Sequence, residues 1–126
     1  MNTMNLAAAP ARLTLKQLLV VDALTCVITG LLFVIAAAPL AGLLGLPQNL
    51  LFYAGLVLFP CAALMTLAAR TQSPALVWLV ILGNLAWAAG SVVVVFAFEP
   101  TTLGTALTLG QAAVVALLGI LEWRAR

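Results

Sequence analysis

The chain has 126 residues, of which 66% are hydrophobic and only 6% are charged. Soluble domains carry about 25% charged residues, and a chain this short needs a polar surface to stay in water. The composition therefore excludes an ordinary soluble domain and predicts an integral membrane protein. The net charge of +2 is too small to predict nucleic acid as a partner.

Four apolar runs follow one another along the chain, separated by short breaks that contain proline. At a rise of 1.5 Å per residue, runs of about 20 residues cross a hydrocarbon core about 30 Å thick. None alternates in polarity as a barrel strand does. We therefore predict an all-α fold: a single four-helix transmembrane bundle over residues 1–126, with spans at about 18–38, 50–69, 75–98 and 103–121 and short tails at 1–17 and 122–126.

The charges predict an orientation for these spans. With an even number of spans, the two termini and the loop near residue 70 share one side of the membrane. All the basic residues fall on that side: Arg12, Lys16, Arg70, Arg124 and Arg126. By the positive-inside rule we expect a multi-pass protein of the bacterial cytoplasmic (inner) membrane with both termini in the cytoplasm.

The first run contains an acid, which is costly in a membrane. Asp22, Thr25, Cys26 and Thr29 are spaced at i, i+3, i+4 and i+7, so they share one helix face. A charged Asp at the centre of a membrane helix costs about 2.5 to 3.5 kcal/mol on insertion scales. We expect Asp22 to face the bundle and to bond to Thr hydroxyls, to pair with Arg70 or to hold a proton. A structural and a functional role are both open.

The third run repeats these offsets with Asn84, Trp87, Ala88 and Ser91. Asn84 corresponds to Asp22, and the shift between the two sets is close to half the length of the chain. The repeated spacing suggests two helical hairpins related by duplication in parallel orientation.

Gln111 lies near the middle of the fourth run, as Asn84 does in the third. Because neighbouring runs are antiparallel, we predict a hydrogen bond between these two amides. Trp87 is also near mid-span, where it is either a packing residue or a stacking wall for a hydrophobic or cationic molecule. The candidate intramembrane polar site consists of Asp22, Thr25, Thr29, Asn84, Trp87 and Gln111.

Catalytic, cofactor-binding and metal-binding residues are not predicted. The sequence has no histidine, only three acids, and two cysteines, Cys26 and Cys61, without CxxC spacing. It has no phosphate-binding loop and no nucleophile–base pair, so general acid–base chemistry has few candidates. We therefore expect that the protein is not an enzyme.

The stretch "GLLFVIAAAPLAGLLGLP", followed by "LLFYAGLVLFPCAALMTLAAR", resembles small bacterial four-helix membrane proteins of the DoxX-like type. The resemblance covers the chain as far as Arg70. It implies a fold and a membrane location, but no activity and no site residues.

These observations predict a non-enzymatic small subunit, an accessory protein or a lipid-associated bundle. The alternative is a minimal proton-coupled transporter or a hydrophobic-ligand-binding protein that uses Asp22 and Trp87. The expected partners are membrane lipid and either further copies of the chain or a larger membrane complex, and not nucleic acid.

Overall fold

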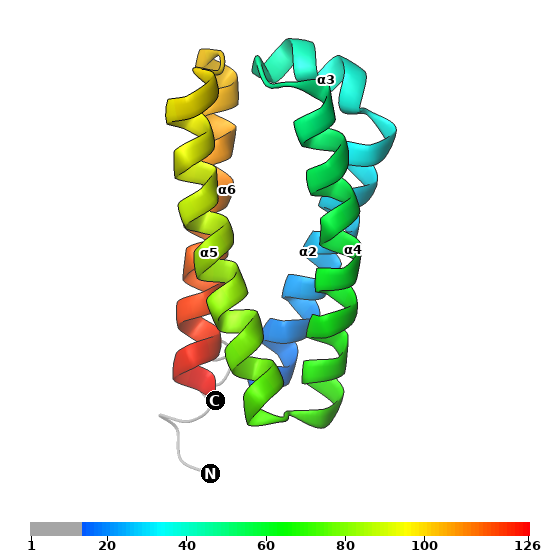
Figure 1. The fold of residues 1–126 in the computed structure, drawn as a ribbon. Coiled ribbons are helices and arrows are strands. Elements are labelled where there is room, and N and C mark those ends of the chain that lie inside the picture. Colours follow the sequence, from blue (N-terminus) through cyan, green and yellow to red (C-terminus); the bar gives the residue numbers. More distant parts are fainter. Residues whose placement is uncertain (1–13) are drawn as a thin grey trace, which may run out of the picture.

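The computed structural model describes residues 14–126, so Arg12 and most of the predicted 1–17 tail lie outside the described residues. The described part folds into five helices (Figure 1). Four of them are long and apolar enough to cross a membrane, which confirms the all-α fold class and the number of candidate spans. The helices are α2 (Leu15–Ile35), α3 (Ala37–Leu44), α4 (Gln48–Thr71), α5 (Pro74–Phe98) and α6 (Thr102–Ala125).

Capping residues set where several helices begin. Thr14 precedes α2, and its hydroxyl accepts a hydrogen bond from the Gln17 backbone while the Gln17 side chain accepts one from the Thr14 backbone. This reciprocal pair satisfies two amides that lack helical partners. Thr101 caps α6 with its hydroxyl, which accepts from the Gly104 amide at 3.0 Å. Pro74 is tolerated at the start of α5 because its missing N–H has no helical partner there.

The short helix α3 lies mostly in the break that the sequence predicted between the first two spans. Its sequence, AAPLAGLL, is rich in Ala and Leu, and Pro39 falls in the first turn, where a proline costs little. Gly45 ends the helix with a φ of 70°, a left-handed conformation that glycine adopts readily. The local preference for helix therefore continues beyond the first apolar run.

The helices form two antiparallel hairpins, α2 with α4 and α5 with α6 (Figure 1). In the first hairpin two glycines allow close packing. A Cβ atom at Gly30 would lie 3.0 Å from the Gly55 carbonyl oxygen, and one at Gly55 would lie 3.0 Å from the Gly30 oxygen. Small residues at a crossing let helix backbones approach in this way.

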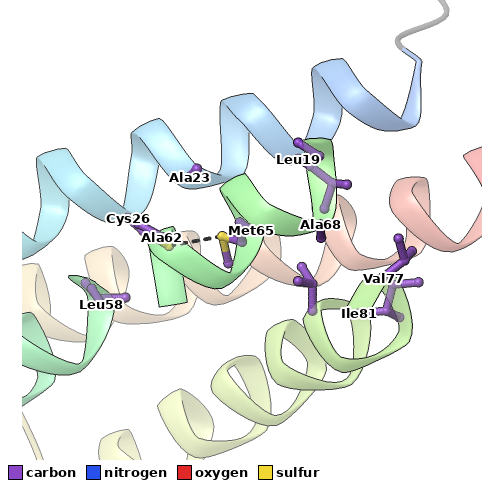
Figure 2. Packing of buried hydrophobic residues seen from close by; sticks show 11 residues of the cluster. Leu19, Ala23, Cys26, Leu58, Ala62, Met65, Ala68, Val77 and Ile81 are labelled. Atoms are coloured by element: carbon purple, nitrogen blue, oxygen red, sulfur yellow. Dashed lines mark hydrogen bonds between the residues drawn. The ribbon is translucent and has the colours of Figure 1, made fainter. Parts of the chain in front are cut away.

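We call one end of the bundle the basic end, because Lys16, Arg70, Arg124 and Arg126 lie at the helix termini there. The two hairpins pack together near this end through a buried apolar cluster (Figure 2). The Cys26 thiol lies in it, 3.7 Å from the Met65 sulfur, and Cys26 and Cys61 are both free thiols. The cluster consists of Leu19, Ala23, Cys26, Leu58, Ala62, Met65, Ala68, Ala69, Val77, Val80 and Ile81.

The opposite end, which we call the α3 end, holds the second junction between the hairpins. The Thr101 amide donates to the Leu44 carbonyl at 3.0 Å, and the Thr101 hydroxyl donates to the Leu43 carbonyl at 3.0 Å. Gly104 is buried directly against the Leu44 carbonyl, with no room for a side chain. The two hairpins are thus tied together at both ends of the bundle.

We predict that Gly104→Ala weakens the fold, because the added methyl group collides with the Leu44 backbone. The expected loss in unfolding free energy is about 1 to 3 kcal/mol, as is typical of overpacking. Gly110→Ala on the same helix is the matched control, since nothing lies within 4 Å of its Cβ position. The control should be neutral, or more stable by up to about 1 kcal/mol. Reversible unfolding in mixed detergent measures both, and equal effects of the two variants would contradict the close contact.

Candidate functional site

Three polar side chains meet between the hairpins near the basic end. Asp22 comes from α2, Asn84 from α5 and Glu122 from α6, and we call them the carboxyl cluster. The Asn84 side-chain nitrogen lies 2.7 Å from Asp22 Oδ2 and 2.9 Å from Glu122 Oε1. Their exposed fractions are 2% for Asp22, 4% for Asn84 and 0% for Glu122. A single amide therefore bridges two buried carboxyl groups.

A glycine allows α6 to reach this position. A Cβ atom at Gly119 would lie 3.3 Å from the Cβ of Asn84 and 3.6 Å from the Ile81 carbonyl oxygen. The absence of a side chain at Gly119 therefore lets α6 lie close against α5. Glu122 follows Gly119 on the same face of α6, one turn later, and so its side chain meets Asn84.

The hydrogen bonds of the cluster leave one oxygen unpaired. An amide nitrogen carries two hydrogens, and Asn84 donates both of them. Glu122 Oε2 is buried and has no hydrogen-bond partner among the described residues. No lysine or arginine among residues 14–126 takes part in these interactions.

Two buried carboxyl groups held by one amide favour the binding of a proton. Two unit charges about 4 Å apart repel by about 4 kcal/mol at an effective dielectric constant of 20. That is comparable with the whole stability of many proteins, about 5 to 15 kcal/mol. One proton bound by the pair of carboxyl groups removes the repulsion between two charges and adds a hydrogen-bond donor to the cluster. The chemistry that this site can perform is the uptake and release of a proton.

The other predicted residues of the Asp22 face lie outside the cluster. The Thr25 side chain is exposed and donates to the Val21 carbonyl of its own helix. Thr29 is half-buried on α2, and Arg70 is exposed at the end of α4. Asp22 is therefore bonded neither to Thr hydroxyls nor to Arg70. Its hydrogen-bonding partner is Asn84, the residue at the corresponding position of the suggested repeat.

The predicted hydrogen bond between Asn84 and Gln111 is wrong. Gln111 accepts from the Trp87 indole at 2.9 Å and donates to the Ser91 hydroxyl at 2.7 Å. The reason is register: Asn84 lies about three helical turns from the basic-end terminus of α5, whereas Gln111 lies about four turns from that of α6. Gln111 is thus about one turn, or roughly 5 Å, too far from the basic end. It meets the next turns of α5 instead.

Trp87 forms one wall of a groove between α4 and α5. The groove has a volume of about 370 Å³, and apolar atoms dominate its lining. Trp87 is half-buried and packs against the apolar cluster of Figure 2. It lies one helical turn from Asn84, so the groove and the carboxyl cluster share a short segment of α5. The groove is lined by Asn49, Leu50, Tyr53, Ala54, Val57 and Trp87.

No protein-family model, curated protein or solved structure matches this chain. The resemblance to DoxX-like proteins therefore stays a prediction. Within residues 14–126, no group of three or more Cys, Asp or Glu side chains is placed to hold a metal ion.

Glu122 belongs to the carboxyl cluster, but the predicted polar site left it out. It follows Gln111 by about three full helical turns, and so lies on nearly the same face of α6. That spacing already indicates a position near the face of Gln111. The prediction placed Glu122 in a polar tail because the apolar run ends at Leu121, whereas α6 continues to Ala125.

A double-mutant cycle tests the revised contacts. Substitution to Ala at Asp22 and Asn84 should give a coupling energy of at least about 0.5 kcal/mol, because the two side chains share a buried hydrogen bond. The same cycle at Asn84 and Gln111 should give a coupling energy near zero. Unfolding in mixed detergent supplies the free energies. A larger coupling for Asn84 with Gln111 than with Asp22 would contradict the described cluster.

Proposed function

We propose that this chain is a non-enzymatic protein of the bacterial inner membrane that binds a hydrophobic molecule and couples binding to a proton at the carboxyl cluster. The membrane location is supported by four helices that are long and apolar enough to span a bilayer. The orientation, with both termini cytoplasmic, is supported by the gathering of basic residues at one end of the bundle.

The observation that carries the proposal is the pair of buried carboxyl groups held by one amide, with Glu122 Oε2 left without a partner among the described residues. If the bundle were only a scaffold, this arrangement would not be needed for its stability. Replacement of buried charged groups by apolar side chains of similar volume usually leaves a protein as stable or makes it more stable. Ionisable groups within membrane spans are costly and mark proton or ligand sites. The cluster is therefore a proton site.

The position of the carboxyl cluster between the two hairpins links the bound proton to the packing of the helices. Asp22 belongs to the first hairpin, whereas Asn84 and Glu122 belong to the second. Loss of the shared proton leaves two like charges across this junction and pushes the hairpins apart. The Trp87 groove lies across the same boundary, between α4 and α5. A proton lost at the cluster therefore changes the groove.

A second candidate function, as an accessory subunit, is favoured by an open surface on α5. Nothing lies within 4 Å of a Cβ atom at Gly83 or at Gly90, and Ala86 between them is exposed. Small residues at this spacing permit close packing of another membrane helix. Loss of an oligomer or of a copurifying subunit in Gly90→Leu would support this function, and unchanged assembly would count against it.

We predict that binding of a hydrophobic aromatic probe depends on pH. In a protein that retains Trp87 alone (Trp78→Phe, Trp123→Phe), pyrene should quench the Trp87 fluorescence by entering the groove. Its affinity should fall as pH rises, because deprotonation restores the repulsion between Asp22 and Glu122 and moves α5 relative to α4. Fluorescence titration in detergent across a pH series measures the effect.

The control variant combines Asp22→Asn with Glu122→Gln in the same background. Both replacements keep the shape of the side chain and remove the charge, so the pH dependence should disappear while pyrene still binds. Ala54→Phe should abolish binding by filling the groove, whereas Ala63→Phe, on the opposite face of α4, should not. Persistence of the same pH dependence without both carboxyl groups would contradict the proton site.

A further inference from the structure

A separate pocket lies at the end of α6, at the basic end of the bundle. It has a volume of about 550 Å³ and is lined by Ile120, Trp123, Arg124 and Arg126. The guanidinium carbon of Arg126 lies 4.5 Å from the centre of the Trp78 ring of α5, a cation–π contact that holds Arg126 across the two helices. The pocket thus combines two positive charges with apolar and aromatic walls.

The chain has no carboxylate side chain to neutralise these arginines. Its whole sequence contains only three acids. Asp22 and Glu122 are buried with Asn84, and Glu99 lies at the α5–α6 connection, at the opposite end of the bundle. None of these three acidic side chains therefore lies free beside Arg124 and Arg126.

The position of the pocket indicates the chemistry of a ligand that could fill it. A helix of 24 residues such as α6 extends about 36 Å, so its end lies in the headgroup layer of a bilayer about 30 Å thick in its hydrocarbon part. Guanidinium groups bind phosphate oxygens through paired hydrogen bonds. Tryptophan rings favour this layer, and Ile120 gives the start of an acyl chain an apolar surface.

We infer that this pocket binds the phosphate headgroup of an anionic glycerophospholipid. Two guanidinium groups in one pocket favour a headgroup of net negative charge over a zwitterionic one. The inference rests on the proposed membrane location, but not on the proton chemistry of the carboxyl cluster.

Native mass spectrometry of the full chain, released from nanodiscs of equal parts phosphatidylglycerol and phosphatidylcholine, tests this directly. The wild type should retain phosphatidylglycerol selectively. The double variant Arg124→Gln/Arg126→Gln should lose that selectivity, with an affinity for phosphatidylglycerol at least about tenfold lower, since two charge-assisted contacts are removed. The matched control is Lys16→Gln/Arg70→Gln, which removes the same charge from the same end but outside the pocket.

Equal losses in the two double variants would overturn the inference in favour of a diffuse electrostatic attraction. Displacement of the lipid by inorganic phosphate at equal concentration would overturn it in favour of a site for soluble anions. If the double variant does not fold, Arg124→Gln alone carries the test, with a smaller loss expected. The Asp22→Asn variant should keep the lipid, so a failure of the proton proposal and a failure of this inference are distinguishable.

Discussion

The hydrogen-bonded bridge from Asn84 to Asp22 and Glu122 determines how the two hairpins meet at the basic end. Each carboxyl group, taken alone, would be a buried and uncompensated polar group, which costs several kcal/mol in an apolar environment. The Asn84 amide donates both of its hydrogens to the two acids. The register of α5 against α2 and α6 follows, because a shift by one turn would break both hydrogen bonds. The apolar cluster around Cys26 and Met65 packs α2, α4 and α5 together near the same end (Figure 2).

The two junctions between the hairpins differ in their chemistry, and so the two ends of the bundle have different roles. At the α3 end, the hairpins meet through backbone groups and the side chain of Thr101, none of which titrates near neutral pH. At the basic end they meet through the apolar cluster and through the carboxyl cluster, which contains the side chains of Asp22 and Glu122. Any response to protons is therefore confined to one end, while the contact of Gly104 with Leu44 keeps the other end fixed. The Trp87 groove runs from the middle of the bundle to the α3 end, where Asn49 and Leu50 line it.

The sequence was sufficient for the coarse architecture and for part of the site. Apolar length alone predicted the four long helices, because helix is the structure that satisfies every backbone group of a long apolar run. The repeated polar spacing of the first and third runs pointed to Asp22 and Asn84 as equivalent positions, and these two residues do form a hydrogen bond. The sequence could not supply the register between antiparallel helices, so it paired Asn84 with Gln111. It also could not show that α6 continues past its apolar run and brings Glu122 inside. Both errors concern depth along the helix axis, which hydropathy defines only to within a turn or two.

The central claim is that Asp22 and Glu122 hold one proton between them. Infrared spectroscopy of the protein in lipid near neutral pH detects it, because a protonated carboxylic acid has a carbonyl stretch that a carboxylate lacks. The account predicts one such band in the wild type. That band should disappear in the double variant Asp22→Asn/Glu122→Gln and should be unaffected by Glu99→Gln, which removes the remaining acid side chain. A wild-type spectrum with no protonated carboxyl band that depends on Asp22 and Glu122 would contradict the account.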